Sequence, residues 1–320
     1  MSITLHRVLS AFVACVFIGC LGCAKSTMPP PLIESIQRLP LKSVHVDGNR
    51  IVYVETGSGA PLILLHGFGG SIWNWEHQQL ALAQHYRILT LDLLGSGQSA
   101  KPDIPYTTSH LVTFLLHFMD AVDIDHATLI GNSMGAGLAM AVALSAPDRV
   151  KALTLIAGFP QALEGAIHSP LYNRFLHHRP PLWLAQFANK LSGRWATRRV
   201  LEEILYDHSL LTAVVIERSF VNRHQRDILP PLYSLTDHLD EWEERYGPRL
   251  GEIQHPVLIL WGEEDNVFSP TMAEDLARIL PNARSHRIPQ AGHLLQWEKP
   301  DEVNAQIISF LKTLNPHSST

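Results

Sequence analysis

The chain has 320 residues, of which 46% are hydrophobic, 17% charged and 8% aromatic, and its formal net charge is −5. These values are typical of a globular protein and exclude a disordered, collagen-like or coiled-coil chain. No basic stripe with interleaved aromatic residues occurs in the sequence, so nucleic acid is not an expected partner.

The amino-terminal residues have the pattern of an export signal. A positively charged start is followed by the apolar run from Val8 to Leu21 and then by small residues, an order typical of a secretory signal. The run is shorter than the about 20 apolar residues that a spanning helix needs. We therefore predict a signal peptide over residues 1–22 and export to the bacterial cell envelope.

All three cysteines lie at or before Cys23, which excludes a disulfide framework in the rest of the chain. The run Cys20–Ser26 resembles a bacterial lipobox, in which cleavage before a cysteine is followed by its acylation. Cys20 is a second fit, and we favour Cys23 because a polar, proline-rich tether, predicted over residues 23–40, begins directly after it. Acylation would attach the protein to a membrane; plain secretion and an uncleaved anchor stay open.

Short apolar runs alternate with helical patterns through most of the remaining chain. Such runs are typical of strands buried on both faces of a parallel sheet, and the alternation predicts an α/β fold. The run Asp47-Gly48-Asn49 predicts a hairpin between the first two strands. Strands are predicted over residues 41–46, 51–55, 61–65, 86–91, 127–130, 152–156, 256–260 and 284–288, and helices over 109–121, 133–145, 270–280 and 302–314.

Residues 161–250 break this alternation. They contain no convincing strand, many histidine, arginine and aromatic residues, and the breakers Pro180-Pro181 and Pro230-Pro231. A segment of this length is too long for an ordinary loop, so we predict a helical cap here, inserted into a core formed by residues 41–160 and 251–316. Within it, Leu182, Trp183, Leu184, Phe187 and Leu191 form an apolar stripe at helical spacing. We expect this stripe to pack onto the core, with an acyl-chain pocket or a membrane-facing lid as the alternative.

The run Gly131-Asn132-Ser133-Met134-Gly135 matches Gly-x-Ser-x-Gly. It follows a predicted strand and opens a predicted helix, which is the setting that a nucleophile elbow requires. A serine hydroxyl needs a base, and the base needs an acid that orients it. We predict His293, in the loop after the last strand, as the base and Asp265, beyond the strand over residues 256–260, as the acid, with Glu264 as its rival.

The chain order of Ser133, Asp265 and His293 is that of α/β-hydrolases. Residues from about Val44 to Leu314 resemble this superfamily in its capped form, through five motifs in order: His66 to Gly70, Asp92 to Ser99, the elbow, Gly262 to Asp265, and Gly292-His293. The resemblance implies a mostly parallel sheet of eight strands flanked by helices, with the cap inserted after the sixth strand.

An acyl-transfer site must also stabilise an oxyanion. The amide of Met134, at the start of the helix that Ser133 opens, is one expected donor. By resemblance to the family's His-Gly-x-Gly pattern, the amide of Phe68 is the second, and His66 is expected to be a structural histidine rather than a base. The glycine-rich turns complete no dinucleotide or Walker pattern, and no histidine pair has the spacing of a common metal site, so we predict neither a cofactor nor a metal.

We therefore predict a serine hydrolase of the esterase or lipase type that acts on small-molecule or lipid esters through an acyl-enzyme. One alternative is a carbon–carbon bond hydrolase of the ring-cleavage-product type, which the elbow sequence also resembles; those enzymes act inside cells, so an exported chain counts against it. A perhydrolase or cofactor-free haloperoxidase would use the same triad. Epoxide hydrolases and haloalkane dehalogenases carry Asp at the elbow and are disfavoured. A binding protein that retains the fold without turnover is the alternative from another class.

Overall fold

A computed structural model describes residues 39–163 and 165–314. The predicted signal peptide, nearly all of the tether, and the acylation sites Cys20 and Cys23 lie outside these residues. None of the helices in the described ranges is both long and apolar enough to cross a bilayer.

The core is one sheet of eight strands in the order β1-β2-β4-β3-β5-β6-β7-β8. The pairs β1–β2 and β2–β4 are antiparallel, and all other neighbours are parallel, which confirms the predicted sheet. The strands are β1 (Lys42–Val46), β2 (Asn49–Thr56), β3 (Pro61–Leu65), β4 (Arg87–Leu91), β5 (Ala127–Asn132), β6 (Val150–Ile156), β7 (Val257–Gly262) and β8 (Ala283–Ile288).

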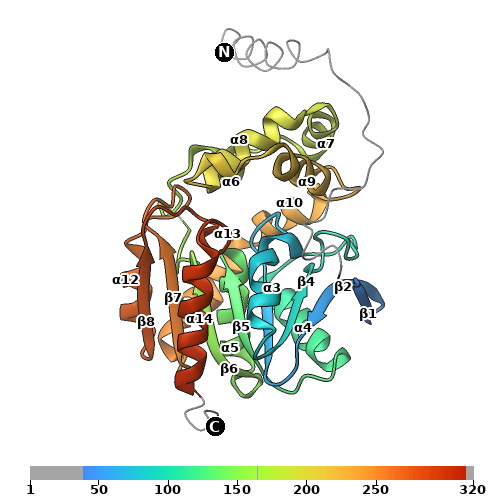
Figure 1. Cartoon of the computed structure of the whole chain (residues 1–320). Coiled ribbons are helices and arrows are strands. Elements are labelled where there is room, and N and C mark those ends of the chain that lie inside the picture. Colours follow the sequence, from blue (N-terminus) through green and yellow to red (C-terminus); the bar gives the residue numbers. More distant parts are fainter. Residues whose placement is uncertain (1–38, 164, 315–320) are drawn as a thin grey trace.

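Helices cover both faces of the sheet (Figure 1). Alternate strand residues serve the two layers: Ile63 and Leu65 belong to one apolar cluster, and Leu62 and Leu64 to the other. The first cluster contains residues of α4 (Thr108–Ala121), α5 (Met134–Ser145) and α12 (Met272–Ile279). The second contains residues of α3 (Glu76–Leu82), α13 (Leu295–Glu298) and α14 (Pro300–Leu314). Short helical turns η1 (Ile72–Trp75) and η2 (Pro147–Arg149) precede α3 and β6.

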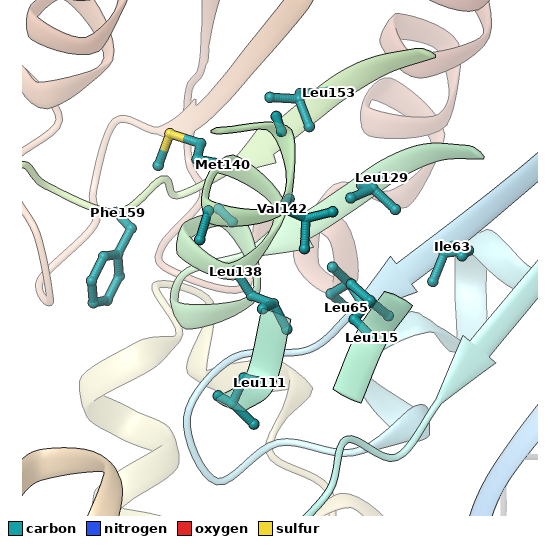
Figure 2. Close-up of a cluster of buried hydrophobic side chains, with 14 of the residues drawn as sticks. Ile63, Leu65, Leu111, Leu115, Leu129, Leu138, Met140, Val142, Leu153 and Phe159 are labelled. Carbon is teal, nitrogen blue, oxygen red and sulfur yellow. The ribbon is translucent and has the colours of Figure 1, made fainter. Parts of the chain in front are cut away.

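Helix α5, which begins directly after Ser133, is buried on almost all sides. Its apolar side chains lie between the sheet and α4, where Leu138 and Val142 share a cluster with Leu111 and Leu115 (Figure 2). A helix that is apolar all round belongs in a protein interior. The start of α5 is therefore a rigid position for a reacting group.

The polypeptide between β6 and β7 forms a helical cap over the carboxyl ends of the parallel strands (Figure 1). The family fold predicted such an insertion after the sixth strand, and the structure has it. The elements between β6 and β7 are α6 (Pro170–His178), α7 (Leu182–Leu191), α8 (Arg194–Ile204), η3 (His208–Leu210), α9 (Ala213–Arg223), α10 (Leu229–Asp237), α11 (Leu239–Glu241), η4 (Trp242–Tyr246) and η5 (Gly247–Glu252). The last two belong to the core rather than to the cap predicted over residues 161–250, because Trp242, Tyr246 and Leu250 pack in the first apolar cluster.

A buried ion pair joins the cap to the core. Arg218 of α9 lies 3.3 Å from the Glu76 carboxylate of α3, and both side chains are less than 5% exposed. The guanidinium also stacks over Trp73 at 4.5 Å, and the indole of Trp297 donates to Glu76. Removing either charge would leave the other buried and unpaired, so this contact fixes one side of the cap on the core.

Most of the apolar stripe on α7 does not pack onto the core, and the expectation was wrong for Trp183, Phe187 and Leu191, whereas Leu182 and Leu184 are half-buried. Trp183, Phe187 and Leu191 are 69%, 57% and 57% exposed. The helix instead turns Asn189 inward, where its amide donates to the carbonyl of Arg223 and the residue lines the cavity beneath the cap. Helical spacing identified the shared face of the stripe, but it does not say which side of the helix meets the protein.

Candidate active site

Ser133 occupies a sharp turn between β5 and α5. Its backbone has φ 53° and ψ −119°, a region that side chains rarely adopt and that persists only where the surroundings impose it. The Ser133 amide donates to the carbonyl of Ile156 on β6 at 2.9 Å. This is the strained geometry that the Gly-x-Ser-x-Gly pattern predicts.

The two glycines of the motif are required by close backbone contacts. A Cβ atom at Gly131 would lie 2.3 Å from the carbonyl of Gly135, and one at Gly135 would lie 2.2 Å from the carbonyl oxygen of Leu65. No side chain fits at these distances. The glycines therefore allow α5 to start directly against β3 and β5, with Ser133 at the apex.

Asp265 and His293 lie together, as the sequence predicts. His293 Nδ1 lies 2.9 Å from Asp265 Oδ2, and both side chains are almost fully buried. The other oxygen, Oδ1, accepts hydrogen bonds from the amides of Val267 and Phe268 at 2.8 and 3.2 Å. Because an ionised carboxylate only accepts, Nδ1 carries the proton, and Nε2 is left with a lone pair that can take a proton.

Ser133 and His293 line the same cavity. Asn132, the neighbour of the serine, donates from Nδ2 to the carbonyl of His293 at 3.1 Å, which holds the two loops together. Within the described residues the Ser133 hydroxyl makes no hydrogen bond to the imidazole. Catalytic contacts of this kind often form only when a substrate is bound, so the base role of His293 toward Ser133 stays a prediction.

The predicted oxyanion donors also border this cavity, which is lined by both Phe68 and Met134. A Cβ atom at Gly67 would approach the Ser133 Cβ to 3.3 Å, so the loop that carries Phe68 passes directly beside the nucleophile. The Phe68 ring packs edge-on against Phe175 of the cap at 5.7 Å. These positions agree with donor roles for the two amides, and the roles themselves remain predictions.

His66 is a structural residue. It is fully buried, its Nδ1 lies 2.8 Å from the Gly67 carbonyl, and its Nε2 accepts from the Leu93 amide at 3.1 Å. Burial lowers the pKa of His66 to about 4, so the ring is neutral near pH 7. This arrangement uses both ring nitrogens to hold the loop of Phe68 and leaves neither for proton transfer.

Asp92 organises the neighbouring glycine-rich turn. Its two carboxylate oxygens accept from the amides of Ile72 and Gln98 at 2.8 and 2.7 Å. A Cβ atom at Gly97 would collide with this carboxylate at 2.1 Å. Burial raises the pKa of Asp92 to about 6. The motif from Asp92 to Ser99 therefore shapes the loops around the site.

Glu264, the rival acid, does not contact His293. Its carboxylate accepts from the amide of Ala291 at 3.0 Å, which fixes the start of the loop that carries the histidine. The geometry therefore favours Asp265 as the acid and gives Glu264 a supporting position.

Glu298 was missed by the sequence reasoning. One oxygen accepts from the amides of Tyr206 and Asp207 in the cap, and the other from the amide of Gly292, next to His293. Burial raises the pKa of Glu298, and these backbone hydrogen bonds oppose the rise. The His293 amide also donates to the Ile204 carbonyl at 2.9 Å, so the histidine loop is bonded directly to the cap.

The site opens into a cavity of about 320 Å³ between core and cap, a size in the usual range for small-molecule sites. Most of its lining is apolar, with side chains such as Leu138, Phe159 and Leu232. Arg223 of α9 also lines it, and no carboxylate in the described ranges forms an ion pair with its guanidinium. Burial lowers the pKa of Arg223, and Tyr172 opposes this shift. No sequence signal distinguishes this arginine from the others in the cap.

Across residues 39–163 and 165–314, no three His, Cys, Asp or Glu side chains gather in a group that would hold a metal ion.

Comparisons with known proteins give the family. A family model described as the alpha/beta hydrolase fold matches residues 60–300. A dihydrolipoyllysine-residue acetyltransferase component of an acetoin cleaving system from Pseudomonas putida is 31% identical over 276 residues, which cover 85% of this chain and 69% of that protein. A 2-hydroxy-6-oxononadienedioate/2-hydroxy-6-oxononatrienedioate hydrolase from Burkholderia vietnamiensis is 31% identical over 271 residues, which cover 82% of this chain and 91% of that protein.

Among solved structures, a meta-cleavage product hydrolase from Pseudomonas fluorescens is 25% identical. It superposes with a TM-score of 0.72 over 87% of this chain and 99% of that one. The matched family model spans both parts of the core and the cap between them. The chain is therefore a hydrolase that belongs to the α/β-hydrolase fold family.

Proposed function

We propose that the protein hydrolyses a carbon–carbon bond next to the carbonyl group of an acidic substrate. Arg223 carries this proposal: it is a cation in the wall of a mainly apolar cavity that also contains Ser133 and His293. Arg223 is half-buried, and a cation in an apolar wall is stabilised by an anionic partner, which a substrate carboxylate would supply. The relatives named for dioate and dienoic acid hydrolysis support the same substrate class.

The site residues suit this chemistry. Ser133 attacks the carbonyl carbon, its proton passes to His293 Nε2, and the amides of Phe68 and Met134 stabilise the oxyanion. The carbon–carbon bond then breaks, and the leaving carbon takes the proton from His293. Water hydrolyses the acyl-enzyme by the same proton route and regenerates Ser133. Asp265 keeps the proton on Nδ1, so that Nε2 remains the base.

The test is turnover of a 2-hydroxy-6-oxo-dienoate, which is measured as the loss of the substrate's conjugated absorbance. We expect Ser133→Ala to lower kcat by about 10⁴-fold or more. Arg223→Met should lower kcat/KM for the acid by about 10- to 100-fold, the effect of one lost charged hydrogen bond, and should leave hydrolysis of a neutral nitrophenyl ester nearly unchanged. Equal losses on both substrates would contradict a carboxylate-binding role for Arg223.

Ester hydrolysis, the function favoured by the sequence, is the second candidate. The mainly apolar cavity supports it, because an acyl chain would bury well there. Nitrophenyl esters of graded chain length and a fluorophosphonate probe that labels Ser133 test it. If kcat/KM for the preferred ester exceeds that for every dienoate offered, ester hydrolysis replaces the first proposal. A wild-type protein inert toward the probe and all substrates would favour a binding protein instead.

A location in the cell envelope, with Cys23 acylated, remains a proposal as well. Mass spectrometry of the amino-terminal peptide tests it, since cleavage before Cys23 would remove residues 1–22 and acylation would add the mass of the lipid.

A further inference from the structure

The outer face of the cap carries four large exposed apolar side chains, which we call the cap face: Trp183, Phe187, Leu191 and Trp195. The first three repeat every four residues along α7, and Trp195 follows four residues after Leu191, at the start of α8. Their exposed fractions are 69%, 57%, 57% and 62%. With about 150–250 Å² for a whole aromatic side chain, the exposed area is roughly 500 Å², at the upper end for a monomer's largest apolar patch.

Both exposed tryptophans of the chain lie on the cap face. The chain has seven, and five of them, Trp73, Trp75, Trp242, Trp261 and Trp297, are buried. Only Trp183 and Trp195 are exposed, and they stand at the two ends of the cap face. Tryptophan is enriched at the interface between lipid and water, where its apolar ring is buried and its N–H group stays near water.

The charge around the cap face is positive. Between residues 165 and 201 there is no Asp or Glu. The same segment holds six cationic side chains, namely Arg174, Arg179, Lys190, Arg194, Arg198 and Arg199. The whole chain has a net charge of −5, so this segment is opposite in sign to the rest of the molecule.

Several of these cations pair with acids elsewhere in the cap. Arg194 pairs with Glu217, and Arg198 and Arg199 share Glu202; Arg179 pairs with Asp237. Surface ion pairs of this kind are weak, and a guanidinium can exchange its carboxylate for a lipid phosphate. Lys190, beside Leu191, has no ion-pair partner in the described part of the chain, so it is available to a headgroup.

The cap face lies next to the active-site cavity. Helices α7 and α8 form part of the cavity wall through Asn189, Val200 and Leu201, and they occupy the side of the cap away from the sheet (Figure 1).

We propose that the cap face docks on the surface of a membrane that contains anionic lipid. The tryptophan, phenylalanine and leucine side chains enter the boundary between headgroups and acyl chains, and the surrounding lysine and arginine residues bind the headgroup phosphates. Docking holds the cavity wall formed by α7 and α8 against the lipid. The proposal does not depend on which bond the enzyme cleaves.

The test uses the full chain and the fluorescence of its tryptophans. Vesicles of phosphatidylcholine, with or without phosphatidylglycerol, carry lipids brominated on the acyl chains, which quench only tryptophans that reach them. Because Trp183 and Trp195 are the two exposed tryptophans, quenching reports on the cap even if the amino-terminal segment also binds lipid. We expect quenching that needs phosphatidylglycerol and weakens at high salt, with slower amide exchange over residues 182–199.

The decisive variant is the double substitution Phe187→Glu and Leu191→Glu. It places two acids at the centre of the cap face, and neither substituted residue lines the cavity. We expect it to lower the apparent affinity of the cap for the vesicles by about tenfold or more. Leu80→Glu is the matched control, since Leu80 is also an exposed leucine, 42% exposed, but belongs to α3 of the core and not to the cap face, and this variant should bind as wild type does.

Fluorophosphonate labelling at the wild-type rate shows that each variant is folded. Absence of quenching and of slower exchange in the wild-type chain would overturn the proposal. Equal quenching in wild type and in the double variant would also overturn it. A wild-type protein that forms dimers without lipid, and a double variant that is monomeric, would assign the cap face to a second copy of the chain instead.

Discussion

The close contact between α5 and β3 gives a sharp prediction for Gly135→Ala. The new Cβ atom would lie 2.2 Å from the Leu65 oxygen and 2.8 Å from the His66 oxygen, both backbone atoms, whereas real Cβ contacts stay above 3.0 Å. Helix and strand must therefore separate by about 0.8 Å. Because β3 is hydrogen-bonded to β4 and β5 on its two sides, the strand cannot move away, and the start of α5 must shift.

The size of the effect follows from two opposing contributions. Overpacking a rigid interior costs about 3 kcal/mol at the upper end of its usual range. Replacing glycine by alanine inside a helix favours folding by about 1 kcal/mol. We therefore expect a net loss of about 2 kcal/mol in the free energy of unfolding, measured by urea denaturation. The shift at Ser133 should also slow fluorophosphonate labelling by about 100-fold, the effect of a misplacement near 1 Å.

Gly137→Ala is the matched control, with the same substitution two residues further along the same helix. Its Cβ atom would meet only the side chain of Phe159, at 3.0 Å, and that ring can turn aside. We expect its unfolding free energy to stay within about 1 kcal/mol of wild type. If Gly135→Ala were as stable and as reactive as wild type, the explanation of the motif by backbone contact would be refuted.

Three further predictions use other contacts. Glu76→Gln should lower the free energy of unfolding by about 3–5 kcal/mol, because Arg218 is left buried and unpaired; a loss below 1 kcal/mol in urea would contradict the buried pair. Glu298→Gln should lower kcat for any substrate more than it raises KM, since the amide accepts through one oxygen only and loosens the His293 loop; unchanged steady-state kinetics would argue against this positioning. Two buried groups change the stability in opposite directions as the pH falls from 6.5 to 4. The folded pKa of His66 is lowered to about 4, so its protonation favours the unfolded chain and lowers the free energy of unfolding by about 3 kcal/mol. The folded pKa of Asp92 is raised to about 6, so its protonation favours the folded chain and raises the free energy of unfolding by about 3 kcal/mol. Asp92→Asn should therefore lose about 3 kcal/mol more than wild type on this acidification, and parallel urea profiles at a series of pH values would disprove it.

The sequence predicted those parts of the fold that depend on local pattern. Each predicted strand and core helix has a counterpart in the structure, with ends that differ by a few residues. Apolar runs and the Gly-x-Ser-x-Gly spacing carry this information directly, because burial on both faces and close backbone contact restrict the residue types. The juxtaposition of Asp265 and His293 followed from the rule that the carboxyl ends of parallel strands meet at one edge.

The sequence could not predict contacts that depend on how the cap is placed. Arg223 lines the cavity because of the position of α9, and Glu298 bonds the His293 loop to the segment after α8. Nothing in the local sequence marks either residue. The expectation that Phe187 and Leu191 pack onto the core was wrong for the same reason. An amphipathic helix has one apolar face, and only the tertiary arrangement decides whether that face meets protein or the outside.

The insertion of the cap between β6 and β7 has a consequence for how the enzyme matures. These two strands are parallel neighbours, yet the entire cap separates them along the chain. Asp265 and His293 follow the cap, and Ser133 precedes it. During synthesis Ser133, the predicted nucleophile, emerges before the predicted acid Asp265 and the predicted base His293. The entropic cost of closing so long a loop grows only slowly with its length, but pairing between distant segments slows folding. Ser133 can therefore meet Asp265 and His293 only after the chain that follows the cap has returned to the sheet beside β6.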